Sequence, residues 1–362
     1  MNPAVGAARR NVGSGRQSIC FVTETRRTER PVLDPSVRYR CHHRAEALAD
    51  EGHVCTILSA SEFFVRPDLC HDVYIFHRPN ACRPGLAKTI ETLRDAGKPV
   101  VADYDDLIFG EEDVALISSS VRNATMTAEH AIAAFRSNLE ALRMFGAVSC
   151  STEPLAEEVR MAHPGARIQV VPNTLPRSVL EFHDRVGSWA LPRSSVTIGY
   201  FAGTRSHDRD IAEISDVLHR VLCENPSFTL LMVGPVDVPR NLAALPNVFV
   251  RDVVGYPRLP AIMATCAVSI APLERSRFNE CKSRVKFLEA ALSGCRLIAT
   301  AIPDMAAIGP DHIDLVETPD DWYEALGRVL DAGARLERAR RNRALLEQAA
   351  AAPSLRLEVD AA

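Results

Sequence analysis

Short apolar runs alternate with stretches of helical periodicity along most of this chain. In the first half the apolar runs, which are rich in β-branched residues, are Ile19–Val22, Val54–Leu58, Val73–Phe76, Val100–Ala102, Ala147–Cys150 and Ile168–Val171. Helical stretches lie between them at about 38–51, 84–96, 121–145 and 153–162. Strands that are apolar on both faces and alternate with helices indicate a parallel sheet covered by helices on both sides. The first half is therefore predicted to be a doubly wound α/β domain.

The same alternation begins again after a break at Pro172–Pro176 and a polar stretch that extends to about Ser195. The predicted strands of this second series are Val196–Ala202, Phe228–Val233, Val248–Val250, Ala267–Ala271, Leu297–Thr300 and Asp314–Val316, with helices at about 208–223, 257–265, 280–293 and 320–347. The length of 362 residues suits two domains of the usual size. We predict a disordered tail over 1–16, domains over 17–177 and 196–350, a linker over 178–195 and a tail over 351–362.

Composition narrows the class of protein. Hydrophobic residues make up 47% and charged residues 24%, as in an ordinary soluble globular protein. Lys and Arg number 42 against 46 Asp and Glu, so the net charge of −4 argues against a general nucleic-acid binder. The ten cysteines form no CxxC pair, and neither a membrane-spanning stretch nor a signal peptide is recognisable. We therefore expect a cytoplasmic protein with reduced thiols.

Positive charge is concentrated near the N-terminus. Nine arginines (Arg9, Arg10, Arg16, Arg26, Arg27, Arg30, Arg38, Arg40 and Arg44) stand in a segment that holds three acidic residues. Arginines near anionic lipid contribute about 1 kcal/mol each. The segment therefore suggests either an anionic acceptor or a weak peripheral contact with the inner face of an anionic membrane.

The segment Phe278–Gly294 carries the strongest chemical signal. With Asn279 as N-cap and Gly294 as stop, the pattern predicts one helix in which Lys282, Lys286 and Glu289 share a face at i, i+4 and i+7. A helix N-terminus with two lysines suits a diphosphate, and Glu289, about 10 Å further along, suits the hydroxyls of a ribose. The alternative is a solvated face with a Lys286–Glu289 ion pair.

A glycine turn follows the first strand of the second series and precedes a helix. Gly203, Thr204, Arg205 and His207 in this turn are candidates for donor phosphate contacts, with Arg205 favoured. Asp208 and Asp210 are better explained as helix-capping residues.

Several segments together resemble the retaining glycosyltransferases of the GT-B fold, in the large group that contains family four. Phe278–Thr300, after the strand Val268–Pro272, is similar to their nucleotide-binding helix. Further similar segments are Ile198–Thr204 with His207 and Asp210, Leu230–Gly234, Val170–Asn173, Ser36–Arg40, Val100–Leu107 and Ser151–Leu155. The order of these segments over about 17–350 carries the resemblance, since no single one is decisive.

The resemblance implies two Rossmann-like domains facing each other across a cleft, with the acceptor in the first and the nucleotide sugar in the second. It implies transfer of a hexosyl group to an acceptor hydroxyl, in cell-surface polysaccharide or glycolipid synthesis, without a metal or a cofactor. Glu289 then matches the second glutamate of the family's E-x(7)-E motif. The first glutamate falls on Cys281, with Glu280 one residue early, while Asn279, Lys282 and Ser283 match the Asn-x-x-Lys-Ser pattern of some relatives.

The acidic cluster Asp103, Asp105 and Asp106 at the end of a first-domain strand invites a Mg²⁺ or Mn²⁺ interpretation. The resemblance instead places these residues on the acceptor side of the cleft, where one of them serves as base if the enzyme inverts configuration. Arg78, which follows the preceding strand, is a further candidate for acceptor contact.

Three activities remain open from the sequence. The favoured one is the hexosyltransferase just described. A nucleotide-sugar epimerase would use the same donor site without an acceptor, and the departure at Cys281 keeps a non-catalytic GT-B binding module possible. The sequence does not choose the nucleotide, the sugar, the acceptor, the stereochemistry or the oligomeric state.

Overall fold

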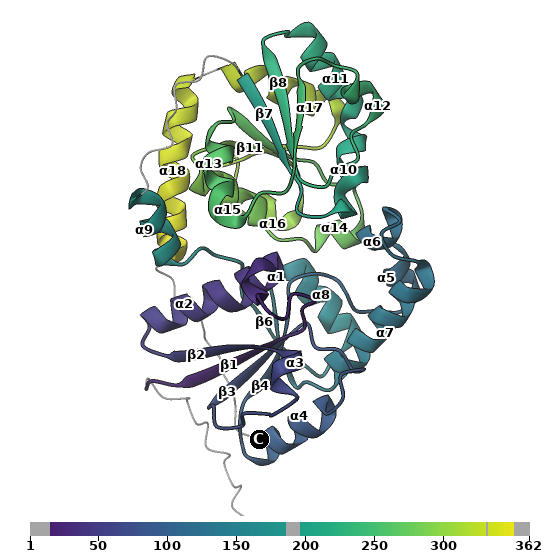
Figure 1. Cartoon of the computed structure of the whole chain (residues 1–362), viewed down its shortest axis with the longest axis vertical. Helices are drawn as coiled ribbons and strands as arrows, with labels where there is room; N and C mark the ends of the chain where they lie inside the picture. Colours follow the sequence, from purple (N-terminus) through teal and green to yellow (C-terminus); the bar gives the residue numbers. More distant parts are fainter. Residues whose placement is uncertain (1–14, 186–195, 331, 351–362) are drawn as a thin grey trace, which may run out of the picture.

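The structure is a computed structural model that describes residues 15–185, 196–330 and 332–350. It contains two α/β domains, one above the other in Figure 1, each built on a parallel six-stranded sheet. This arrangement confirms the predicted two doubly wound domains. The predicted tail over 351–362 and all but two residues of the tail over 1–16 lie outside the described residues.

The first sheet has the strand order β2-β1-β3-β4-β5-β6. Its strands are β1 (Ser18–Thr23), β2 (Val54–Ser59), β3 (Val73–His77), β4 (Val100–Tyr104), β5 (Ala147–Cys150) and β6 (Arg167–Val170), each overlapping a predicted one. The helices around it are α1 (Pro35–Val37), α2 (His43–Asp50), α3 (Ala60–Phe63), α4 (Leu86–Asp95), α5 (Glu112–Leu116), α6 (Ser119–Arg122), α7 (Ala128–Arg143) and α8 (Glu153–Ala162). A π-helical turn, Arg38–His42, leads into α2.

The second sheet has the order β12-β11-β10-β7-β8-β9. Its strands are β7 (Val196–Phe201), β8 (Phe228–Val233), β9 (Val248–Arg251), β10 (Val268–Ala271), β11 (Arg296–Thr300) and β12 (Asp314–Val316). Its helices are α10 (Asp208–Glu213), α11 (Ser215–Glu224), α12 (Arg240–Ala243), α13 (Leu259–Ala264), α14 (Arg277–Glu280), α15 (Val285–Leu292), α16 (Pro303–Ala306), α17 (Pro319–Gly327) and α18 (Ala332–Ala350). The six predicted strands of this half are also confirmed.

Two long predicted helices are divided in the structure. The helix expected over 320–347 is α17 followed by α18, because α17 ends at Gly327 and a short 3-10 turn, Arg328–Leu330, changes the direction of the chain. The helix expected over 280–293 is α14 and α15, separated by a turn at 281–284. The second division changes the description of the site.

The connection between the domains includes a helix of its own. Within the stretch 178–195, predicted as a linker, residues 178–185 belong to α9 (Arg177–Arg185). The Arg343 guanidinium of α18 donates hydrogen bonds to the Leu180 carbonyl, 3.2 Å away, and to Asp184 Oδ2, 2.5 Å away. Figure 1 shows α18 along one edge of the second domain, with α9 beside the end of α18 that is nearer the first domain.

Each sheet reverses its strand order near the interface between the domains. In the second sheet β7 lies between β8 and β10, and in the first sheet β1 lies between β2 and β3. Parallel sheets bind ligands at such reversals, outside the carboxyl ends of the strands. Gly234, which ends β8, has φ +120°, and a Cβ there would lie 1.9 Å from the Ala202 carbonyl oxygen that follows β7. Only glycine permits this close approach beside the β7 end.

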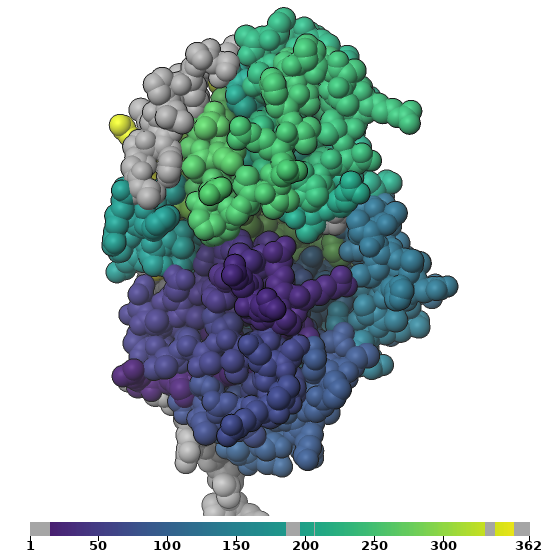
Figure 2. Space-filling model, in the orientation of Figure 1, coloured from purple at the N-terminus to yellow at the C-terminus, as the bar shows by residue number. Residues whose placement is uncertain are grey.

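The two domains are in contact across this interface, as Figure 2 shows where the purple early residues meet the green second domain. Phe278 and Cys281 of the second domain are 4% and 1% exposed and belong to the hydrophobic core cluster of the first domain. The Thr152 hydroxyl donates to the Cys281 carbonyl at 2.9 Å. Arg277 pairs with Glu158, and Arg122 pairs with Glu274. The turn at 281–284 is therefore held against the first domain.

Candidate functional site

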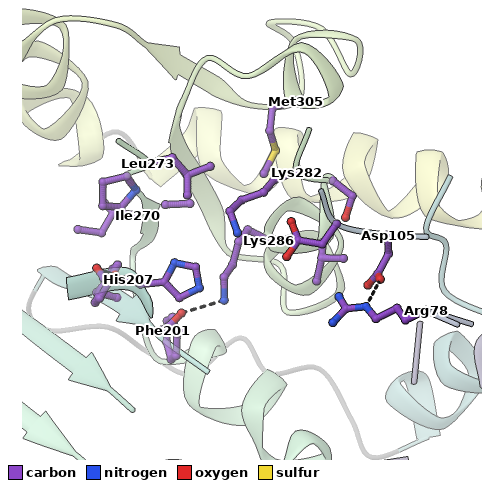
Figure 3. Close-up of a pocket in the computed structure, with 15 residues that line it drawn as sticks. Arg78, Asp105, Phe201, His207, Ile270, Leu273, Lys282, Lys286 and Met305 are labelled. Atoms are coloured by element: carbon purple, nitrogen blue, oxygen red, sulfur yellow. Dashed lines mark hydrogen bonds and ion pairs between the residues drawn. The ribbon is translucent and has the colours of Figure 1, made fainter. Parts of the chain in front are cut away.

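A cavity of 190 Å³ lies between the domains at the carboxyl ends of the strands. Its second-domain wall includes Tyr200, Phe201, His207, Ile270, Ala271, Pro272, Leu273, Lys282, Ser283, Val285, Lys286 and Met305, and its first-domain wall is Arg78, Asp105 and Asp106. Figure 3 shows Lys282, Lys286 and His207 opposite Arg78 and Asp105. Seven of the residues singled out from the sequence thus meet at one place.

The turn that carries Lys282 differs from the predicted helix. Ser276 rather than Asn279 is the N-cap: its hydroxyl accepts the Asn279 N–H at 3.2 Å and starts the short α14. The Asn279 side chain is 3% exposed and donates to the Glu274 carbonyl at 2.7 Å. The prediction of Asn279 as the cap of one long helix is therefore wrong, because burial of Phe278 and Cys281 in the first domain interrupts the helix. Asn279 and the exposed Glu280 are not among the residues that line the cavity.

The two lysines reach the cavity from different backbone elements. Lys286, in the first turn of α15, donates from Nζ to the Phe201 carbonyl at 2.8 Å, the contact drawn in Figure 3. Lys282 lies in the turn before α15, with its Nζ 5.2 Å from the centroid of the Phe278 ring. Ser283, beside Lys282, is held through its hydroxyl by the Asn173 amide at 2.8 Å. Two cations and a hydroxyl therefore converge at the start of α15.

Glu289 lies on α15 behind this wall and is not among the residues that line the cavity. Its carboxylate is 9% exposed, Oε1 accepts the Tyr39 hydroxyl at 3.4 Å, and Oε2 lies 3.5 Å from Lys286 Nζ. Oε2 has no hydrogen-bond partner among the described residues. The alternative interpretation, a solvated face with a Lys286–Glu289 ion pair, is confirmed for the ion pair but not for the solvated face, because Glu289 is buried. Burial and the neighbouring Glu289 charge raise the pKa of Tyr39 well above its usual value.

His207 is the one residue of the predicted glycine turn that lines the cavity. Its Nδ1 lies 2.8 Å from Asp210 Oδ2. Burial lowers the pKa of His207, against the hydrogen bond that its ring donates to Asp210. Since a carboxylate only accepts, the neutral ring carries its proton on Nδ1 and leaves Nε2 as an acceptor. His207 is therefore suited to a sugar hydroxyl, whereas it was predicted to contact phosphate.

The remaining residues of that turn have other roles. Gly203, Thr204 and Arg205 are exposed and are not among the residues that line the cavity. Asp208 and Asp210 do not cap α10: Asp208 accepts the Asp237 N–H at 2.9 Å, and Asp210 accepts the Glu274 N–H at 2.8 Å. Both aspartates therefore hold neighbouring loops, because the chain returns to this turn from two later connections.

The first-domain wall is a network centred on Asp105. Its Oδ1 accepts Arg78 Nε at 2.7 Å, and its Oδ2 accepts the Ser36 hydroxyl at 2.6 Å. His77 joins both: its Nε2 lies 2.8 Å from Ser36 Oγ and 3.4 Å from Asp105 Oδ1. Burial opposes ionisation, but Arg78 and His77 outweigh it and hold the pKa of Asp105 well below its usual value. Arg78 has φ +53°, a left-handed conformation that costs energy in a non-glycine residue and recurs at functional sites.

Asp103 and Asp106 flank this network but differ from each other. Asp103 is 1% exposed and does not line the cavity. Its Oδ1 accepts hydrogen bonds from Arg40 at 2.6 Å, from Arg44 at 2.7 Å and from the Ser149 hydroxyl. Its predicted place on the acceptor side is therefore not what the structure gives. Asp106 does line the cavity, and the one hydrogen bond that its carboxylate accepts among the described residues is from the Leu107 N–H at 3.2 Å.

Several residues that organise the site were not predicted from the sequence to do so: Ser36, Tyr39, Arg40, His77 and Asn173. Ser36–Arg40 and Val170–Asn173 carried part of the family resemblance, but no local pattern assigned a role to their side chains. Arg40 and Arg44 are four residues apart on a helical stretch, which places them on one face. That spacing was a readable signal for a shared acidic partner.

The comparisons with known proteins agree with this geometry. Residues 195–332 match the family described as glycosyl transferases group 1. A search of curated proteins finds no match. Among solved structures, a sucrose-phosphate synthase from Thermosynechococcus elongatus has a TM-score of 0.60 at 13% identity, over 92% of this chain and 94% of that chain.

Two trehalose-phosphate synthases are also similar in structure. The enzyme from Burkholderia multivorans has a TM-score of 0.61 at 12% identity, over 92% of this chain and 95% of that chain. A UDP-forming enzyme from Burkholderia xenovorans, in complex with glucose-6-phosphate, has a TM-score of 0.57 at 13% identity, over 92% of this chain and 97% of that chain. At these identities the matches establish the fold.

The chain therefore has the GT-B fold, as predicted. The match to the group 1 glycosyl transferases lies within its second domain, and the cavity lies where this domain meets the first. Among the described residues, no helix is long and apolar enough to cross a membrane.

Proposed function

We propose that this protein transfers a hexosyl group from a nucleotide-diphosphate sugar to an acceptor hydroxyl, in the synthesis of a cell-surface polysaccharide or glycolipid. The observation that carries the proposal is the pair Lys282 and Lys286 in a cavity at the β7–β10 reversal of a group 1 glycosyltransferase domain. Two lysines in the wall of a cavity between the domains favour an anionic ligand, and a diphosphate supplies that charge.

The residues have separate roles toward the donor. Departure of the nucleoside diphosphate leaves developing negative charge on the bridging oxygen, which Lys282 and Lys286 stabilise. Lys286 Nζ is already held by the Phe201 carbonyl at 2.8 Å, so little reorganisation accompanies the reaction. The Ser283 hydroxyl and the start of α15 contact the phosphates. His207 Nε2 accepts a hydroxyl of the transferred sugar. Glu289 lies behind the cavity wall, so its Oε2 accepts the ribose hydroxyls only if donor binding moves the side chains that cover it.

The two lysines also support a metal-independent reaction, because they supply the positive charge that a divalent cation supplies in other transferases. We expect the initial rate with and without excess EDTA to be equal. A rate that falls with EDTA and returns with Mg²⁺ would contradict this part of the proposal.

The acceptor lies against Arg78, Asp105 and Asp106. Asp105 is a poor base because its pKa is held low by Arg78 and His77. Asp106 is the better candidate to orient the acceptor hydroxyl, since its carboxylate faces the cavity with one hydrogen bond from Leu107. If the product is inverted, Asp106 is the proposed base; NMR of the anomeric proton in the product decides between inversion and retention.

The first experiment is a thermal-shift screen against UDP, GDP, ADP, dTDP and CMP. A ligand at 100 times its Kd adds about 2.7 kcal/mol, or a few degrees in melting temperature. We expect one nucleoside diphosphate to shift the wild type, with a reduced shift in Glu289→Ala and Lys282→Met and a full shift in Lys88→Met, whose lysine is exposed on α4. No shift in any folded sample would move the assignment to a non-catalytic binding module.

Turnover distinguishes the two enzymatic alternatives. Incubation of the matching nucleotide sugar with candidate acceptors is expected to release the nucleoside diphosphate only when an acceptor is present. Isomerisation of the nucleotide sugar alone would identify an epimerase instead.

We also propose a peripheral membrane contact through the loop after β1. Arg26, Arg27 and Arg30 are exposed there, and Val32 and Leu33 beside them are 41% and 42% exposed. Basic and apolar side chains together suit the surface of an anionic bilayer. Binding to vesicles with 30% phosphatidylglycerol is expected to disappear in the Arg26→Gln/Arg27→Gln/Arg30→Gln variant and to persist when exposed Arg240, Arg251 and Arg258 are changed to Gln. Equal binding of both variants would overturn the contact.

A further inference from the structure

A second cavity, of 330 Å³, lies on another side of α15 from the donor site. Its walls come from α2 of the first domain, the crossover segment 171–175, α15, α16 and the end of α18. Most of the lining is apolar: Leu175, Phe287, Leu288, Ile308, Leu345 and Leu346. A volume of this size falls within the range of small-molecule pockets, about 300–1,000 Å³. We refer to it as the hinge cavity.

One wall of the hinge cavity carries a buried positive charge that is only partly compensated. Arg44 lines the cavity and is 5% exposed. Its Nη1 donates to Asp103 Oδ1 at 2.7 Å, but its Nε has no hydrogen-bond partner among the described residues. Asp103 is shared with Arg40, which is fully buried and donates to both carboxylate oxygens. Two guanidinium groups thus rely on one carboxylate.

The neighbouring charges do not remove this excess. The next carboxylate, Asp105, is already paired with Arg78. The second arginine that lines the hinge cavity, Arg284, is balanced by Asp304, which accepts its Nε at 3.0 Å. A buried charge without a full counter-charge is costly, so an anion next to Arg44 is favoured. Burial lowers the pKa of Arg44 despite Asp103, which agrees with incomplete compensation.

We propose that the hinge cavity binds a small amphiphilic anion, a carboxylate with an apolar body. The carboxylate pairs with Arg44, and the body packs against Leu175, Phe287 and Leu346. Because the walls belong to both domains and to the crossover between them, the ligand stabilises this arrangement of the domains. The proposal does not depend on donor chemistry, since none of its contacts is in the donor cavity apart from the shared helix α15.

The test is isothermal titration of the full chain with octanoate, and with octan-1-ol as an uncharged probe of the same length. No nucleotide is added, so that failure of the donor assignment leaves the result interpretable. We expect octanoate to bind the wild type at least ten-fold more tightly than octan-1-ol. Equal affinities, or no binding of octanoate, would overturn the proposal.

Two variants locate the binding. Ala349→Phe places a ring in the cavity from α18 and is expected to abolish octanoate binding. Ala344→Phe, on the exposed side of the same helix, is the matched control and is expected to leave it unchanged. Binding that survives Ala349→Phe would place octanoate elsewhere and overturn the assignment. Arg44→Gln is expected to abolish the preference for octanoate; should this variant fail to fold, the two alanine variants still decide.

Discussion

The two walls of the 190 Å³ cavity between the domains are built on parallel six-stranded sheets, but their charged side chains differ in how far they are already paired. On the first-domain side the Asp105 carboxylate is bonded to Arg78, Ser36 and His77. On the second-domain side Lys286 Nζ lies 3.5 Å from Glu289 Oε2, and among the described residues no carboxylate is paired with Lys282. The first wall is thus a fixed polar template suited to neutral hydroxyls, and the second wall favours an anion.

The first prediction compares the loss of stability when buried Asp103 is changed with the loss when Asp106, which lines the cavity, is changed. Asp103→Asn removes the counter-charge of buried Arg40 and Arg44 and is expected to cost about 3–5 kcal/mol of folding free energy. Asp106→Asn is expected to change stability by less than about 0.5 kcal/mol while lowering kcat/KM. Urea unfolding of both variants is the measurement, and equal losses of stability would mean that the two carboxylates are not distinct.

The second prediction tests the charge of the second-domain wall. Lys282→Met is expected to lower kcat by about 100- to 1,000-fold, because it removes a preorganised cation from the leaving group. Steady-state kinetics with saturating donor measure the effect, and Lys88→Met on α4 serves as control. A kcat within about three-fold of the wild type would show that the lysine is not part of the reaction.

The third prediction concerns the pH dependence of stability that the buried side chain of His43 causes. His43 packs against Tyr39 with ring centroids 4.8 Å apart, and burial lowers its pKa to about 4. The unfolded chain takes up this proton below about pH 6.5 but the folded chain only near pH 4, so stability is present above pH 6.5 and is lost as the pH falls. The loss reaches roughly 3 kcal/mol near pH 4.

Urea unfolding at pH 7.5, 5.5 and 4.5 measures this loss. His42, His183 and His207, whose pKa values are also lowered, act in the same direction. His43→Gln is expected to reduce the pH dependence, with His219→Gln on the exposed side of α11 as control. An unchanged dependence in His43→Gln would assign the acid sensitivity to other groups.

The smallest expected effect distinguishes the neutral contact of the second wall from its lysines. His207→Leu removes one uncharged acceptor, worth about 0.5–1.5 kcal/mol, so kcat/KM is expected to fall about two- to twelve-fold. The ratio of variant to wild type is expected to stay constant from pH 7 to 8, because the ring is already neutral there. A loss comparable to that of Lys282→Met would assign His207 a charged role.

The sequence was informative where structure is local and poor where partners are distant. The twelve strands of the described residues were all predicted, because each overlaps a short run that is mostly apolar and lies between turn residues. The helix break at 281–284 was not predictable, since it results from burial of Phe278 and Cys281 in a core more than a hundred residues earlier in the chain. Asp103, Asp105 and Asp106 are neighbours in sequence, but only the fold shows that Arg40 and Arg44 take the first and Arg78 the second.

The burial of Phe278 and Cys281 in the core of the first domain links the position of Lys282 to contact between the domains. Lys282 follows Cys281 directly, so the turn that presents this cation is fastened to the opposite domain. Separation of the domains would remove the first-domain contacts of this turn and expose Phe278 to water. Renewed contact of the domains would restore the position of the turn and the burial of Phe278. If the proposed transfer reaction is correct, we expect Lys282 to be positioned beside the departing nucleoside diphosphate only when the first-domain wall is in place. Hydrolysis of the nucleotide sugar between turnovers would then be slow.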